Sequence, residues 1–103
     1  MLVARVLGNV VTTHKVETMT GAKLLVVDPL LMDEKKMAFT STGKTYVAVD
    51  AMGAGTDDIV LLTQGSSARM TDTTAKAPVD CVVIGIIDTV NLTGREIYRK
   101  GNE

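Results

Sequence analysis

Aromatic side chains are scarce in this sequence, which has one Phe, two Tyr and no Trp among its 103 residues. Proteins that bind single-stranded nucleic acid stack bases on exposed aromatic side chains beside basic ones, so this chain offers few stacking platforms. The charge distribution does not support nucleic-acid binding either, because 11 basic and 12 acidic residues are interspersed and the net charge is −1. The composition therefore argues against nucleic acid as a partner.

Histidine and cysteine each occur once, which argues against the common catalytic and metal-binding arrangements. Cys81 cannot form an internal disulfide, and its position inside an apolar run predicts a small buried hydrophobe in a reducing compartment. His14 stands in a polar stretch with no cysteine or carboxylate at metal-ligand spacing, so we interpret it as a surface residue. Because no nucleophile and base can be paired, we expect no enzymatic activity, no catalytic residue, no cofactor and no bound metal.

Long apolar runs are also missing, since none approaches the ~18–20 residues that span a bilayer. The first residues carry Arg5 and Asn9 and lack a basic leader and a cleavage site, so we expect a cytoplasmic protein with no membrane partner. What the chain does have is a high apolar content, with a mean hydropathy of +0.22 and only 22% charged residues. A single domain over residues 1–103 leaves part of this apolar surface exposed, which predicts a homo-oligomer.

The spacing of apolar residues predicts a chain that is almost entirely β. Residues 1–13 have apolar positions on both faces, as in a strand with one face in a barrel and the other against a neighbour. We expect Pro29 to end the second strand, since proline cannot donate to a strand ladder. Residues 30–44 indicate an exposed excursion that ends in a turn, and residues 66–70 a single helical turn. An all-β, five- to six-stranded OB-like Greek-key barrel with at most one short helix follows from the predicted strands at residues 1–13, 23–28, 46–50, 58–63, 79–90 and 96–100.

Two clusters of very small residues follow predicted strands, and function is expected there. Glycine weakens a strand and adds no packing, so such clusters indicate tight bends or the close approach of another chain. Neither is a nucleotide-binding motif: Gly43-Lys44-Thr45 precedes a strand rather than a helix, and Asp58 stands where a dinucleotide fingerprint has its third glycine. We therefore expect a subunit interface or pore formed by Gly53, Ala54, Gly55, Gly65, Ser66, Ser67 and Arg69.

Charged residues near these clusters have two different interpretations. The spacing of Asp50, Asp57 and Asp58 does not fit a calcium loop, so we interpret them as solvated carboxylates at strand ends. Arg69 follows four small residues, and its guanidinium presents five donors in a rigid fork. We expect it to bridge a junction, with Asp50, Asp57 or the carbonyls of residues 53–55 as acceptors in the same subunit or the next.

Five stretches carry a specific pattern when they are taken together and in order. They are residues 1–11 (MLVARVLGNVV), 23–30 (KLLVVDPL), 47–55 (VAVDAMGAG), 65–69 (GSSAR) and 78–88, with PVD at 78–80 and IGIID at 84–88. This pattern resembles one known family, the bacterial microcompartment vertex (pentameric shell) proteins of the EutN/CcmL type, and the likeness covers nearly the whole chain. Two departures stand out: Asp57-Asp58 replaces a Gly-Glu pair that is common in the family, and residues 35–44 carry little of its signature.

The resemblance implies a structural protein rather than an enzyme. It implies a small OB-like barrel that forms homo-pentamers and occupies the vertices of a polyhedral shell, in contact with hexameric shell proteins of the same microcompartment. The expected location is the microcompartment shell in the cytoplasm. A small OB-like ligand- or nucleic-acid-binding module is the alternative function, and an enzyme with a site shared between subunits is a third.

Overall fold

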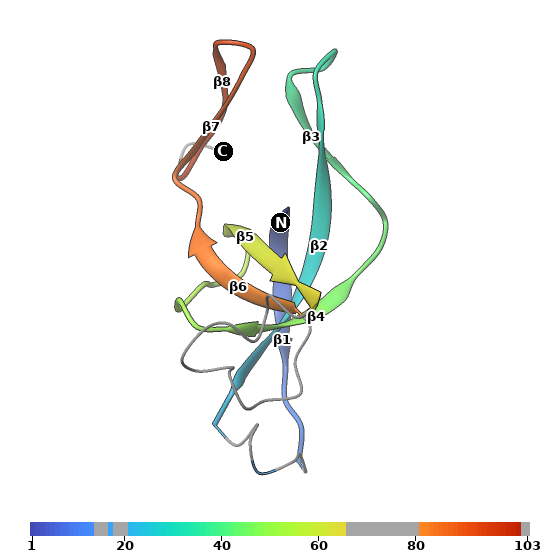
Figure 1. Cartoon of the computed structure of the whole chain (residues 1–103), viewed down its shortest axis with the longest axis vertical. Helices are drawn as coiled ribbons and strands as arrows, with labels where there is room; N and C mark the ends of the chain where they lie inside the picture. Colours follow the sequence, from blue (N-terminus) through green and yellow to red (C-terminus); the bar gives the residue numbers. More distant parts are fainter. Residues whose placement is uncertain (14–16, 18–20, 66–80, 102–103) are drawn as a thin grey trace.

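The computed structural model describes residues 1–13, 17, 21–65 and 81–101, which form β-strands joined by turns and loops (Figure 1). This part of the chain contains no helix long and apolar enough to cross a membrane. The all-β fold expected from the sequence is confirmed, and the helical turn expected at residues 66–70 lies outside the described residues. The strands are β1 (Leu2–Val10), β2 (Lys23–Asp33), β3 (Ala38–Ser41), β4 (Tyr46–Asp50), β5 (Ile59–Gln64), β6 (Cys81–Ile86), β7 (Thr89–Leu92) and β8 (Arg95–Arg99).

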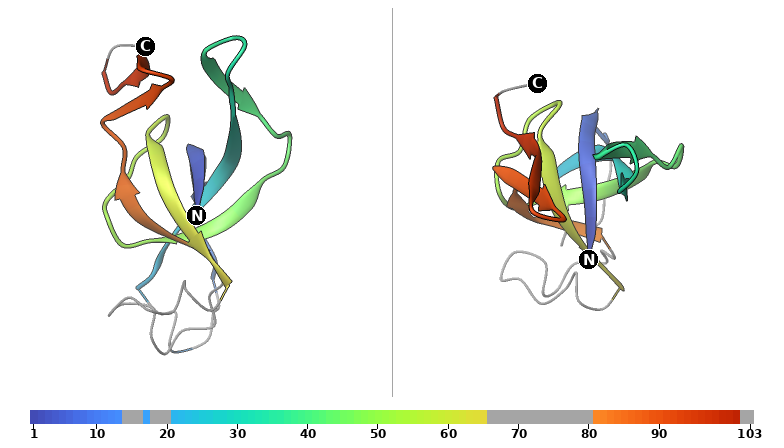
Figure 2. Two further views of the ribbon diagram at one scale, coloured as in Figure 1. Left: turned by 45° about the horizontal axis from the view of Figure 1, so that its top comes forward. Right: turned by 90° about the horizontal axis from the view of Figure 1, so that it is seen from above.

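Five of these strands close into a barrel. Hydrogen-bonded neighbours follow the order β1-β5-β6-β4-β2, and β2 also pairs with β1 to complete the circle. The pairings are antiparallel except for β4–β6, which is parallel and limited to Val49↔Val82 and Asp50↔Val83. Figure 2 (right) shows the barrel from above, along the long axis of the molecule. The predicted small barrel is therefore confirmed.

Small and β-branched side chains fill the interior of the barrel. In β1, Ala4 and Val6 are fully buried while Leu7 is 46% exposed, so the alternation predicted for this strand is confirmed. A barrel of five strands has a narrow interior, which valine and alanine fill without room for large rings. This explains why a well-packed core is compatible with three aromatic residues. The main cluster also contains Leu25, Val27, Ala48, Ala54, Val60, Leu62, Cys81 and Val83.

Cys81 is 5% exposed within this cluster, as the sequence predicted. The substitution Cys81→Ala removes one buried sulfur and leaves a small cavity, so we expect the free energy of unfolding to fall by about 1 kcal/mol. Denaturant unfolding followed by circular dichroism measures this change. The mass of the oligomer should stay the same, because the altered group lies inside the barrel. A change in that mass would contradict the assignment of Cys81 to the core.

The prediction that Pro29 ends the second strand is wrong. Strand β2 continues through Pro29, which pairs with Ala4 of β1, and then runs on beside β3. The Pro29 carbonyl accepts hydrogen bonds from the Thr42 backbone N–H at 3.2 Å and from Thr42 Oγ1 at 2.8 Å. Pro29 stands between the last β2–β4 pair and the first β2–β3 pair, so its missing N–H interrupts neither ladder. Residues 30–44 therefore contain most of a β-hairpin, although Leu31 at 62% exposure fits the predicted exposed character.

The prediction of one strand over residues 79–90 is also wrong. Strand β6 ends at Ile86, and the chain then enters a separate hairpin made of β7 and β8. The turn between them has positive φ at Thr93 (49°) and Gly94 (81°), as in the two-residue turns that match strand twist. The short strand predicted at residues 96–100 is confirmed as β8. Apolar composition alone does not show where one strand ends and the next begins.

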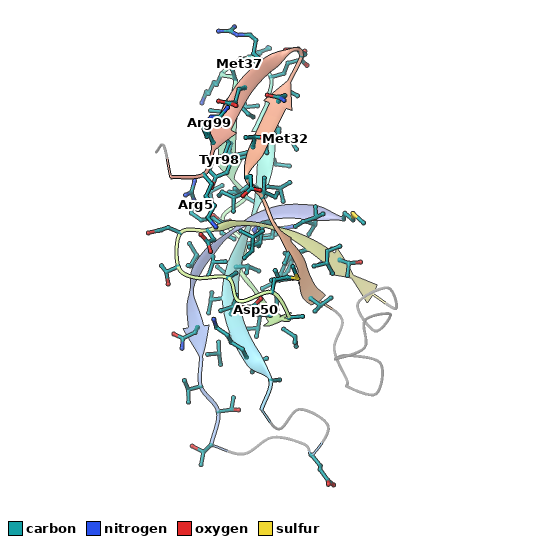
Figure 3. The ribbon with its side chains drawn as sticks, turned by 90° about the vertical axis from the view of Figure 1, so that its left-hand side faces the viewer. Arg5, Met32, Met37, Asp50, Tyr98 and Arg99 are labelled. Carbon is teal, nitrogen blue, oxygen red and sulfur yellow. The ribbon has the colours of Figure 1, made fainter. Side chains whose placement is uncertain are left out.

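Two hairpins project from the same end of the barrel (Figures 1 and 2). One is formed by the end of β2 with β3, and the other by β7 with β8. Their contact includes the rings of Phe39 and Tyr98, whose centroids are 5.9 Å apart and tilted by 46°. Thr93 Oγ1 also lies 3.8 Å from Met37 Sδ. Figure 3 shows Met32, Met37, Tyr98 and Arg99 gathered in this region, away from Asp50 in the barrel.

Candidate functional site

The candidate site is the segment that connects β4 to β5, residues 50–58, which we call the Asp50 loop. The side chain of Asp50 is fully buried (0% exposed) at the end of β4. Its Oδ1 accepts the backbone N–H groups of Met52 at 2.8 Å and Gly53 at 3.1 Å, and its Oδ2 accepts that of Ala54 at 2.8 Å. A carboxylate that binds three successive amides fixes the path of the loop.

Lys23 holds the same loop from the neighbouring strand. It is the cross-strand partner of Asp50 in the β2–β4 pair. Its Nζ lies 3.6 Å from Asp50 Oδ2 and donates a 3.0 Å hydrogen bond to the carbonyl of Ala54. The prediction that Asp50 is a solvated carboxylate is therefore wrong, because its side chain is buried. Three amides and an ammonium group compensate for the burial of its charge.

A second set of bonds fixes the other half of the loop. Asp58 Oδ2 accepts the Gly55 N–H at 2.8 Å, and the Asp58 N–H donates to the Gly55 carbonyl at 3.1 Å. Asp57 N–H donates to the Val6 carbonyl at 2.8 Å, and Val6 N–H donates to the Asp58 carbonyl at 2.9 Å. The side chain of Asp58 is 24% exposed and lies 3.9 Å from Lys100 Nζ, so it is not simply solvated. The Asp50 loop is thus rigid at both ends.

Gly53, Ala54 and Gly55, the three small residues of this loop, are in different structural environments. Gly53 has φ +82°, a backbone conformation that favours glycine. Ala54 is fully buried in the main core cluster, and its N–H and carbonyl are bonded to Asp50 and Lys23, so the residue anchors the loop to the barrel. Gly55 is exposed, its φ is outside the left-handed region, and an added Cβ would meet only Asp58 Oδ2 at 3.9 Å. Nothing described within the subunit therefore requires glycine at position 55.

The second predicted cluster lies elsewhere. Gly65 directly follows β5, is exposed and has φ +66°. The Asp50 loop leads into the first residue of β5, so the two clusters stand at opposite ends of this strand. Six residues of strand separate them by about 20 Å at ~3.3 Å per residue. One subunit does not bring the clusters together, and Ser66, Ser67 and Arg69 lie outside the described residues.

An exposed apolar groove was not predicted from the sequence. It has a volume of about 510 Å³. Leu31 is 62% exposed there and Tyr46 is 37% exposed. The only signal in the sequence was the apolar Leu30-Leu31-Met32 within a stretch interpreted as an excursion. We call this feature the Tyr46 groove; its lining includes Leu2, Pro29, Leu31, Lys44, Tyr46 and Gln64.

These features define a class of protein: a small closed β-barrel with a rigid, glycine-bearing loop and an exposed apolar groove, both suited to contact with other protein chains. The model of the family "Ethanolamine utilisation protein EutN/carboxysome" matches residues 1–88. The chain belongs to this EutN/CcmL family. The match ends directly before β7, so the β7–β8 hairpin lies outside the matched segment.

Individual relatives agree with this assignment. The chain is 43% identical to the carboxysome shell vertex protein CcmL of Gloeobacter violaceus over 103 residues, which are 100% of this chain and 98% of the relative. The solved structure of that protein has a TM-score of 0.87 at 42% identity and covers 99% of this chain and 100% of its own. The GrpN pentameric microcompartment shell protein from Rhodospirillum rubrum has a TM-score of 0.73 at 41% identity, covering 89% of this chain and 98% of its own. The family predicted from the sequence is confirmed.

Proposed function

We propose that five copies of this chain form a ring that occupies a vertex of a polyhedral microcompartment shell. The observation that carries the proposal is the near full-length likeness to a shell protein described as pentameric, at 41% identity and a TM-score of 0.73. A flat array of hexagonal tiles cannot close into a polyhedron unless five-fold units are inserted. A ring of identical subunits supplies such a unit when one face of each subunit binds a different face of the next.

The proposed role is structural rather than catalytic. The relatives compared above are named as shell vertex proteins. The Asp50 loop uses its carboxylates to bind its own backbone and Lys23, which is the chemistry of a rigid scaffold. Its neighbours in the shell are proposed to be hexameric shell proteins of the same microcompartment. No cofactor or nucleic acid enters this function.

The glycine clusters are proposed to lie where subunits meet or line the central opening. Gly53 and Gly55 present exposed backbone on the rigid Asp50 loop, and Gly65 presents it at the far end of β5. Ala54 is fully buried, so it supports this surface by holding the loop through its carbonyl, which accepts a hydrogen bond from Lys23. Ser66, Ser67 and Arg69 remain predicted members of the same surface.

Native mass spectrometry of the purified protein tests this proposal. We expect a species with five times the mass of the 10.9 kDa chain and no bound small molecule. An exposed apolar groove gives each subunit surface to bury in such a ring. A monomer that binds an oligonucleotide would instead support the ligand- or nucleic-acid-binding module and contradict the shell function.

A further inference from the structure

Strand β4 carries the two candidate contact features at its two ends. Tyr46, its first residue, lines the Tyr46 groove, and Asp50, its last residue, begins the Asp50 loop. Strand β5 then leads away from the loop and ends at Gln64, which also lines the groove. Figure 1 shows β4 crossing the barrel in one direction and β5 crossing back. The loop and the groove therefore lie on opposite sides of one subunit.

We propose that the Asp50 loop of one subunit seats in the Tyr46 groove of the next subunit around the ring. This inference rests on the proposed pentamer and specifies which surfaces meet in it. A ring of identical subunits needs two different complementary faces on each copy. A loop and a groove on opposite sides of the barrel satisfy that requirement, whereas two features on one side would pair subunits face to face.

The composition of the loop fits a contact with another chain. Met52, next to the glycines, is 49% exposed and presents an apolar side chain on a rigid support. Gly55 is exposed and is not required by the backbone or by the space around it within the subunit. Since glycine gives the unfolded chain more conformational freedom than alanine, it lowers stability at a position that alanine could occupy, and its use here is explained by the close approach of another subunit.

The Tyr46 groove has apolar surface and a positive charge that complement the Asp50 loop. Leu31 and Tyr46 provide exposed apolar surface for Met52. Among the described residues that line the groove, Lys44 is the only charged one. The loop carries Asp57, whose residue is exposed beside the glycines. The contact thus joins an apolar knob to an apolar groove and a carboxylate to an ammonium group.

The arrangement also explains why the sequence contains two glycine clusters. Within one subunit they stand at opposite ends of β5 and cannot act together. Gly65 directly follows Gln64 at the groove. When the loop of one subunit enters the groove of the next, Gly55 approaches Gly65 across the junction, and the absence of side chains there permits close contact of the two backbones.

Disulfide formation between introduced cysteines tests this pairing. The test variant is Met52→Cys/Leu31→Cys. Asp50 pairs with Lys23, and Leu31 lies eight residues further along β2, about 26 Å away at ~3.3 Å per residue. A bond within one subunit is therefore impossible, since bridged Cα atoms lie within ~7 Å. We expect mild oxidation to give a ladder of covalent oligomers of up to five chains on non-reducing gels.

The matched control is Met52→Cys/Met32→Cys. Met32 neighbours Leu31 on β2, is 46% exposed and does not line the groove. We expect no ladder from this control, nor from Met52→Cys alone. A pentamer without a Leu31 ladder, or with a ladder from the Met32 pair instead, would overturn the proposed pairing and leave the ring in place. Wild-type protein that is not pentameric by native mass spectrometry would overturn the ring itself.

Discussion

Asp50→Ala is expected to lower the free energy of unfolding by about 2–4 kcal/mol, because it removes a buried charged acceptor from three backbone amides. The N–H of Ala54, a fully buried residue, loses its partner, whereas those of Met52 and Gly53 belong to exposed residues and can bind water. Lys23 also loses its ion pair. The change is measured by denaturant unfolding of the purified variant.

Two further variants separate the contributions to this loss. Asp50→Asn keeps one carbonyl oxygen as an acceptor, so we expect a smaller loss than for Asp50→Ala. Lys23→Ala should reduce the free energy of unfolding by less than about 1 kcal/mol, since the Lys23 side chain is 52% exposed and water screens its charge. If Asp50→Ala unfolded at the same denaturant concentration as the wild type, the carboxylate would not be what fixes the loop.

Gly55→Val is expected to leave the subunit folded and to dissociate the pentamer. Within the subunit the new Cβ meets only Asp58 Oδ2, at 3.9 Å, so the free energy of unfolding should change by less than about 1 kcal/mol. In a close-packed junction the added methyl groups are overpacked, which typically costs about 1–3 kcal/mol at each contact. The penalty recurs at every junction of the ring. Sedimentation velocity over a range of protein concentrations measures the result.

Gly8→Val provides the comparison for this variant. Gly8 also has an unstrained φ and no atom within 4 Å of an added Cβ, but it lies on β1 and outside the Asp50 loop. We expect it to remain pentameric. An unchanged pentamer for Gly55→Val, or equal dissociation for both variants, would show that position 55 has no special place in the junction.

Much of the fold could be predicted because the strands bury one face. The alternation in β1 reports a side-chain period that the barrel enforces, whereas the continuous apolar run around β6 has no such period and indicated only a buried strand. The incorrect predictions concern segments whose structure depends on contacts with distant parts of the chain. Pro29 continues a strand because it stands between two ladders, and no local pattern reveals that gap.

The candidate site was predicted only in part, for a similar reason. Glycines at positions 53 and 55 indicated a bend after an apolar strand, and the structure has a loop there; that this loop lies at a subunit interface stays a prediction. The role of Asp50 was missed, since its burial depends on Lys23, 27 positions earlier in the chain. The Tyr46 groove was missed because its lining comes from residues 2 to 64, which only the closed barrel brings together.

The β7–β8 hairpin has a consequence for how this barrel can be altered. None of its residues belongs to either hydrophobic core cluster of the described chain, although Tyr98 is buried at 8% exposure. Its contacts with the rest of the described chain include the Phe39–Tyr98 ring contact, the Thr93–Met37 contact and the long Lys100–Asp58 ion pair. The turn at Thr93 and Gly94 lies at the tip of this hairpin, away from both core clusters. A peptide inserted at this turn is therefore expected to extend the projecting end of the subunit while the packing that defines the barrel stays unchanged.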